Sequence, residues 1–305
     1  MDPVLRRSTT IRVSLIVIPF LAIIVAARML SPLIRDARIR SDLASVDDFI
    51  REDLAGVTVY RAAAVDPETA RGLGVALAAF ASELVEEWGE FFLLRPVPPP
   101  VVLEVFASSE QLATFHSEQY RETFHNLGGF YDSRSRLVAV PAPVFALESL
   151  RTLFHEGTHL VFDLSHSGSV GRFPIWLNEG LATYFEVTDL GGGGVLELGG
   201  VDRSAMRMLA EALDSGRIRS ADQVLRSGPA EFRGERNGDY YSAAHGLVAY
   251  LMEGEGGALR RGFGSYYREL RSGRAVNPGL IYWKVDSDAE SFDRGWRRFV
   301  SESVR

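Results

Sequence analysis

Two histidines and a glutamate stand close together in the segment His155-Glu156-Gly157-Thr158-His159. On a helix, residues four apart lie one turn above each other on the same face, so both imidazoles can reach a single ion with Glu156 beside them. Apolar residues flank the segment on both sides, which predicts a buried helix. A buried group of polar side chains needs a partner that offsets its desolvation, and a metal ion is such a partner.

A third ligand can come from the next predicted helix. It runs from Trp176 to Glu186 and begins Trp-Leu-Asn-Glu-Gly, with Glu179 twenty residues after His159. Catalytic zinc takes three protein ligands and leaves a fourth position for water, and two histidines with a carboxylate are one of its standard sets. We therefore expect one Zn²⁺ held by His155, His159 and Glu179. The alternative for the first motif alone is a helix whose histidines are only hydrogen-bonded.

Together the two motifs resemble those of the gluzincin zinc metallopeptidases, whose third ligand is a glutamate on the helix after the His-Glu-x-x-His helix. The Trp-Leu-Asn-Glu-Gly segment is similar to the aminopeptidase branch, and the spacing is closer to the thermolysin branch. The aminopeptidase strand Gly-x-Met-Glu-Asn is replaced here by Gly-Gly-Phe-Tyr-Asp, so amino-terminal trimming is not implied. The order of elements over residues 57–303 looks like small bacterial gluzincin-like domains of unassigned function. The resemblance implies a zincin-like two-lobed fold and a peptide or protein substrate.

The chemistry expected at such a site needs a base and a hydrogen-bond donor. Zinc polarises the scissile carbonyl and lowers the pKa of its water to about 7. Glu156 is placed to remove the proton and then pass it to the leaving amine. The negative charge of the tetrahedral intermediate needs a donor from the opposite lobe. Related gluzincins use a tyrosine at the start of a later helix, which here points to Tyr241, with Tyr240 or His245 as alternatives; a core tyrosine and a buried histidine are the structural interpretation of these residues.

The resemblance also assigns supporting roles. Glu186 matches a glutamate at the end of the family's Trp-Leu-Asn-Glu-Gly helix and would accept a ring N–H from a ligand histidine, and Thr183 is a rival for that role. Gly129, Phe130 and Tyr131 would form the edge strand of the cleft, whose free N–H and C=O groups pair with an extended substrate. An ordinary hairpin is the alternative for that strand.

The N-terminus predicts a membrane segment. Residues 1–12 form a short basic tail, and residues 13–27 carry no charge. That run is shorter than the roughly 20 residues that span a bilayer comfortably. One interpretation is a signal peptide cleaved after Ala27, and the other is an uncleaved signal-anchor over residues 13–30. We favour the transmembrane anchor, with the catalytic domain periplasmic or otherwise extracytoplasmic. Arginines on both sides of the segment leave the orientation open.

Composition and patterning predict the rest of the fold. The chain has 305 residues, 46% of them apolar, which is enough for a sizeable core. It has no cysteine, which excludes disulfides and thiolate ligands, and its net charge of −7 argues against a nucleic-acid partner. A linker helix is expected over residues 31–55. In the catalytic domain, residues 56–305, we expect strands at 57–60 and 101–106, a hairpin at 128–140, and helices at 67–92, 203–215, 240–253, 257–271 and 289–303.

This order predicts an α+β fold, in which a mixed N-terminal sheet with helices is followed by a C-terminal helical lobe. Three further histidines have no spacing that joins them to the site, and we expect surface or loop positions for His116, His125 and His166. The leading hypothesis is a membrane-anchored zinc peptidase, in particular an endopeptidase. The alternative is a non-catalytic, zinc-containing envelope protein that binds or scaffolds a partner. Glu156 favours catalysis, because a purely structural zinc site needs ligands but no base.

Overall fold

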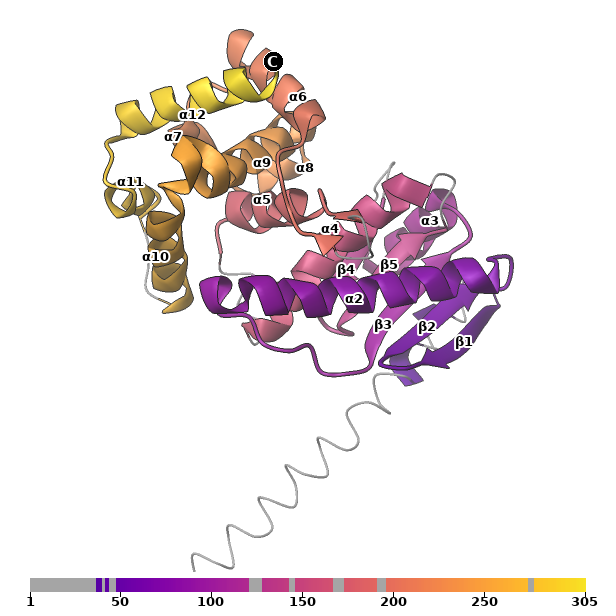
Figure 1. Cartoon of the computed structure of the whole chain (residues 1–305). Coiled ribbons are helices and arrows are strands. Elements are labelled where there is room, and N and C mark those ends of the chain that lie inside the picture. Colours follow the sequence, from indigo (N-terminus) through magenta and orange to yellow (C-terminus); the bar gives the residue numbers. More distant parts are fainter. Residues whose placement is uncertain are drawn as a thin grey trace, which may run out of the picture. The chain divides into compact units, whose positions relative to one another are not determined.

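The computed structural model describes residues 37–39, 42–43, 48–120, 128–142, 146–166, 173–190, 196–273 and 277–305 (Figure 1). The chain falls into two compact units, Met1–Phe49 and Ile50–Arg305, and the second holds every element discussed below except the first residue of one strand. The predicted basic tail and signal-anchor, residues 1–30, lie outside the described residues. Within the described residues, each helix is too short or too polar to cross a lipid bilayer.

A mixed five-stranded sheet forms the first half of the larger unit, in the order β1-β2-β3-β5-β4. β2 and β3, and β3 and β5, pair in parallel, whereas β4 pairs with β5 in the antiparallel sense. The central strands β2 and β3 are buried along their whole length, including their polar residues Thr58, Arg61 and Glu104. This sheet and its helices confirm the predicted α+β class. The strands are β1 (Phe49–Leu54), β2 (Val57–Ala62), β3 (Val101–Phe106), β4 (Phe130–Asp132) and β5 (Leu137–Pro141).

The linker helix predicted over residues 31–55 is wrong at its end, because Phe49–Leu54 is the edge strand β1. A tight turn at Gly56, where φ is 82°, joins β1 to β2. Glu52 of β1 lies 2.7 Å from Nε of Arg61 on β2 and 3.0 Å from Nε of Arg71. Pairing with β2 and this ion-pair cluster outweigh the loosely helical spacing of the segment, and the folded domain therefore begins before residue 56.

Two long helices, α2 (Pro67–Phe92) and α4 (Ala146–Ser165), pack against each other and against the sheet (Figure 1). α2 begins where the sequence predicts, because Asp66 accepts a hydrogen bond from the Thr69 amide at 2.8 Å and proline occupies the first turn. Phe80 of α2 stacks on Phe154 of α4 with ring centroids 4.7 Å apart. α3 (Ser109–Tyr120) packs on β3 and β5.

Helices make up most of the second half of the unit. α5 (Ile175–Phe185) and α9 (Asn237–Glu253) pack side by side at its centre (Figure 1). The helices predicted at 176–186, 203–215, 240–253, 257–271 and 289–303 are all present with ends within a few residues, whereas the shorter elements were not predicted. Around the central pair lie β6 (Asp189–Leu190), β7 (Leu196–Glu197), α6 (Arg203–Asp214), α7 (Ala221–Leu225), α8 (Pro229–Arg233), α10 (Arg260–Arg271), α11 (Leu280–Lys284) and α12 (Ala289–Ser303).

Two histidines predicted at the surface or in loops are buried. His116 lies on α3, where its ring stacks on Tyr120 at 4.7 Å. His166 follows α4, with Nδ1 2.5 Å from the Phe162 carbonyl and Nε2 2.9 Å from the Tyr267 hydroxyl. A surface position is therefore wrong for both, and a loop position is wrong for His116, because aromatic rings pack on His116 and hydrogen-bond partners hold the buried ring of His166 in the turn after α4. His125 lies outside the described residues.

His166 should make the fold sensitive to acid. Burial lowers its pKa, and the charges of Arg271 and Arg95 act in the same direction. A group with a lowered pKa binds protons more readily in the unfolded chain, so the free energy of unfolding should fall as the pH drops below about 6.5. Urea unfolding from pH 7.5 to 5 should show this decline, and it should be smaller in His166→Gln. An identical decline in both proteins would assign the acid sensitivity to other groups.

Candidate metal centre

His155 and His159 of α4 meet Glu179 of α5, and one ligand atom from each lies within 4.8 Å of the others. Oε2 of Glu179 is 3.5 Å from Nε2 of His155 and 3.7 Å from Nε2 of His159. Between 14 and 15% of each of these side chains is exposed, so the cluster is open to a small ion from solvent. Two imidazole nitrogens and a carboxylate oxygen at these separations could hold one metal ion.

The charge state of Glu179 suits a ligand. Burial alone would raise the pKa of its carboxyl, but His159 and His155 hold that pKa well below the ordinary value. The side-chain amide of Asn178 donates to the second carboxylate oxygen at 3.5 Å. Glu179 is therefore ionised near neutral pH, as a metal ligand must be.

Two glycines let the ligand helices approach their neighbours. A Cβ on Gly157, between the two histidines, would lie 2.9 Å from Leu77 and 3.1 Å from Phe80 of α2. A Cβ on Gly180, next to the third ligand, would lie 2.7 Å from the Ala244 carbonyl oxygen and 2.8 Å from Val248 of α9. The glycines of both motifs are thus explained by helix packing.

Gly180→Ala should destabilise the fold. Overpacking of this kind lowers the free energy of unfolding by about 1–3 kcal/mol. The better helix propensity of alanine offsets at most about 1 kcal/mol of that loss. Gly72 of α2 is a matched control, because a Cβ there meets nothing within 4 Å. Gly72→Ala should instead raise the free energy of unfolding by about 0.5–1 kcal/mol. Urea titration of both variants measures the contrast, and equal effects would contradict the close α5–α9 contact.

Glu156 lies beside the cluster and against the edge of the sheet. The backbone amide of Tyr131 donates a hydrogen bond to its carboxylate, and a Cβ on Gly129 would lie 3.3 Å from its Cγ. Burial raises the pKa of Glu156, with the nearby histidines opposing the shift. The structure thus brings the predicted base next to the predicted edge strand. β4 is the last strand of the sheet, and residues 129–131 run past Glu156.

Tyr241 is the tyrosine that the structure places near the cluster. Burial raises its pKa, followed by the charges of Glu179 and Glu156 and a hydrogen bond with Glu179. Its phenol is therefore protonated at neutral pH and can donate. The hydroxyl of Tyr240 instead accepts from Nε2 of Gln223 at 2.9 Å. The hydroxyl of Tyr240, the predicted alternative, is thus hydrogen-bonded to a residue of α7 and not to the cluster.

The structure places Glu186 against a ligand histidine. Its Oε2 lies 2.9 Å from Nδ1 of His155, and its Oε1 lies 3.1 Å from Nη2 of Arg151. The rival Thr183 uses its hydroxyl inside α5, where it donates to the Glu179 carbonyl oxygen at 2.9 Å. Of the two, only Glu186 contacts a ligand side chain.

His245 is not brought to the cluster. Its Nε2 accepts from the Asp202 amide at 3.0 Å, and its Nδ1 lies 3.1 Å from the Thr183 carbonyl oxygen. Both ring nitrogens are hydrogen-bonded to backbone groups. Contrary to the prediction, His245 is therefore not positioned to contact a substrate. Arg151 and Asp202 were not predicted from the sequence. The only available signal was that Arg151 stands one turn before His155 on the same helix face.

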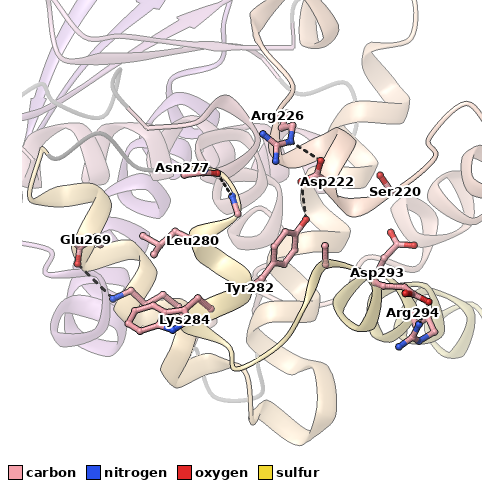
Figure 2. Close-up of a pocket in the computed structure, with 14 residues that line it drawn as sticks. Ser220, Asp222, Arg226, Glu269, Asn277, Leu280, Tyr282, Lys284, Asp293 and Arg294 are labelled. Carbon is pink, nitrogen blue, oxygen red and sulfur yellow. Dashed lines mark hydrogen bonds and ion pairs between the residues drawn. The ribbon is translucent and has the colours of Figure 1, made fainter.

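A groove of about 1200 Å³ lies among α7, α11 and α12, and Figure 2 shows its lining residues. Its charges pair with each other: Arg226 lies 2.7 Å from Asp222, and Lys284 lies 3.7 Å from Glu269. No residue of the His155–His159–Glu179 cluster lines it. The grouping of metal-ligating atoms therefore makes the cluster, rather than this groove, the candidate site.

The part of the chain that contains the site matches a known sequence family. Residues 149–272 match a family described as "Protein of unknown function (DUF1570)", and this span contains all three cluster residues, Glu156, Glu186 and Tyr241. A search of curated proteins found no match. The region from α4 to α10 is therefore similar to a family whose description assigns no activity, and the function has to be argued from the geometry of the site.

Proposed function

We propose that the protein is a zinc-dependent endopeptidase in which Glu156 is the general base. The observation that carries the proposal is the convergence of three ligand atoms within 4.8 Å, with Glu156 directly after His155 and three residues before His159. Two imidazoles and a carboxylate without a thiolate are a donor set of catalytic zinc. When bound, the ion would polarise the scissile carbonyl and acidify the attacking water.

The environment of Glu156 supports its role as a base. Burial raises the pKa of its carboxyl toward the working range of a proton carrier. The Tyr131 amide donates to the carboxylate and restricts its orientation. Glu156 can then take a proton from the attacking water and return it to the leaving amine.

The edge strand β4 favours a peptide over a small-molecule substrate. In an antiparallel pair, the N–H and C=O of one residue both point toward the partner strand or both point away from it. Because the Tyr131 amide donates to Glu156, the N–H and C=O of Tyr131 face away from β5 and toward the site. An extended peptide added to this edge would run directly past the base.

We also propose that the domain has a zincin-like, two-lobed fold. α4 and β4 belong to the sheet half of the domain, and α5 and α9 belong to the helical half. A zincin-like two-lobed metallopeptidase has its metal between two such halves, and Tyr241 of α9 would supply the donor from the second lobe. The signal-anchor over residues 13–30 stays a prediction, and it would hold the domain at the outer face of the membrane.

The direct test uses the full chain with a mixed peptide library. We expect about one zinc ion per chain by elemental analysis and cleavage at internal peptide bonds by mass spectrometry. Treatment with 1,10-phenanthroline should abolish cleavage, and added Zn²⁺ should restore it. Hydrolysis that persists without metal would contradict the proposal. Bound zinc without cleavage of any peptide would favour the non-catalytic, binding or scaffold alternative.

A further inference from the structure

A path of polar contacts leaves the metal cluster at His155. The Nδ1 atom of this ring lies 2.9 Å from Oε2 of Glu186, so one carboxylate oxygen fixes the ring from the side opposite Nε2. The other oxygen of Glu186 contacts Arg151, which also contacts the carboxylate of Asp202. One guanidinium thus joins the carboxylate behind a ligand histidine to a second carboxylate outside the cluster.

The path returns to α5 through α9. Asp202 is the N-cap of α6, where its Oδ1 accepts from the Ser204 amide at 2.6 Å. The Asp202 amide donates to Nε2 of His245 at 3.0 Å, and Nδ1 of His245 lies 3.1 Å from the Thr183 carbonyl oxygen. The contacts therefore close a ring through α4, α5, the start of α6 and α9.

The ring fixes the protonation state of His245. An amide N–H can only donate, so Nε2 of His245 must accept, and a carbonyl oxygen can only accept, so Nδ1 must carry the hydrogen. The imidazole is 1% exposed, and burial lowers its pKa against the nearby carboxylates of Asp202 and Glu186. His245 is therefore neutral and has a single tautomer. Its two hydrogen bonds to backbone groups can hold the helices that it contacts in fixed relative positions.

We infer, on the basis of the proposed zinc site, that Arg151, Asp202 and His245 are positioning residues. They fix the orientation of the His155 ring and the position of α9 relative to the metal. Arg151 and Asp202 hold the Glu186 carboxylate where it receives the Nδ1 hydrogen of His155, which leaves Nε2 for the ion. Because His245 lies one turn after Tyr241 on α9, the same ring sets the position of the proposed donor.

The ion pair of Arg297 is a matched control for that of Arg151. Comparing the two separates an effect on the position of the metal ligands from an effect on folding stability. The side chains of Arg151 and Arg297 are each 37% exposed and each contacts an aspartate, but Arg297 lies on α12 and contacts Asp293. Partly exposed ion pairs contribute little to folding stability. Removing either arginine should therefore leave the melting temperature of the metal-free protein nearly unchanged, and only Arg151 should affect the metal.

The test measures the Zn²⁺ dissociation constant of the full chain by competition with a chromogenic chelator. Groups that orient metal ligands change affinity by about 10- to 100-fold, so Arg151→Met should raise the constant about tenfold. Glu186→Gln should raise it at least as much, and the double variant should match Glu186→Gln alone, because Arg151 acts through Glu186. Arg297→Met should stay within twofold of the parent.

The same measurement tests the return path through His245. His245→Leu should weaken Zn²⁺ binding severalfold, whereas His245→Asn, whose amide can both accept and donate, should recover part of the loss. An Arg151→Met variant that binds Zn²⁺ like the parent, or that adds a full second loss to Glu186→Gln, would overturn the inference. Because the readout is affinity, zinc binding without hydrolysis would refute the proposed function and leave this inference standing.

Discussion

Glu156→Gln should lower kcat by about a hundredfold to ten thousandfold while the protein keeps its metal. Glutamine preserves the size of the side chain and can still interact with the Tyr131 amide, but it cannot take a proton from water. The ligand atoms of His155, His159 and Glu179 are untouched, so the zinc content should not change. Loss of turnover with retained metal is the result that separates a base from a ligand.

The measurement compares initial rates on the best peptide from the library with zinc content per chain. Glu87→Gln on α2 is the control for loss of one carboxylate, because burial also raises the pKa of Glu87 but no contact joins it to the cluster. It should retain the parent's kcat within twofold. If Glu156→Gln kept more than a tenth of the activity, another group would have to be the base.

The metal cluster could be predicted from the sequence because its geometry is local. His155 and His159 are joined by one helical turn, and Glu179 stands on the next helix along the chain, so few conformations separate the three. The start of α2 was equally local, since Asp66 caps the helix that Pro67 begins. Such features depend on contacts within one helix or between two consecutive helices, so they can be predicted from the sequence alone.

Contacts between distant segments could not be predicted in this way. β1 is a strand because it pairs with β2 and because Glu52 meets Arg61 and Arg71, and its own residues are compatible with a helix. His245 shares a helix face with Tyr241, yet its partners come from Asp202 and Thr183, 43 and 62 residues away. α9 is buried nearly all round, so its periodicity does not tell which face meets the His155–His159–Glu179 cluster.

Tyr241→Phe should lower kcat by about a hundredfold to a thousandfold with little change in KM, which is the effect of removing one donor to a developing oxyanion. The phenol is held near the site by the edge-on contact of its ring with Phe232, whose centroid lies 5.3 Å away. Phenylalanine keeps that contact and loses only the hydroxyl. Zinc content should stay at the parent's level, because the hydroxyl is not among the three ligand atoms.

Tyr240→Phe is the matched control for this change. It removes the hydroxyl of the neighbouring residue, which accepts a hydrogen bond from Gln223 at 2.9 Å. We expect a loss of about 1 kcal/mol in the free energy of unfolding and a kcat within twofold of the parent. If Tyr240→Phe were instead the inactive variant, α9 would have to turn when substrate binds. If neither variant lost activity, the negative charge would have to be stabilised by the metal and backbone groups alone.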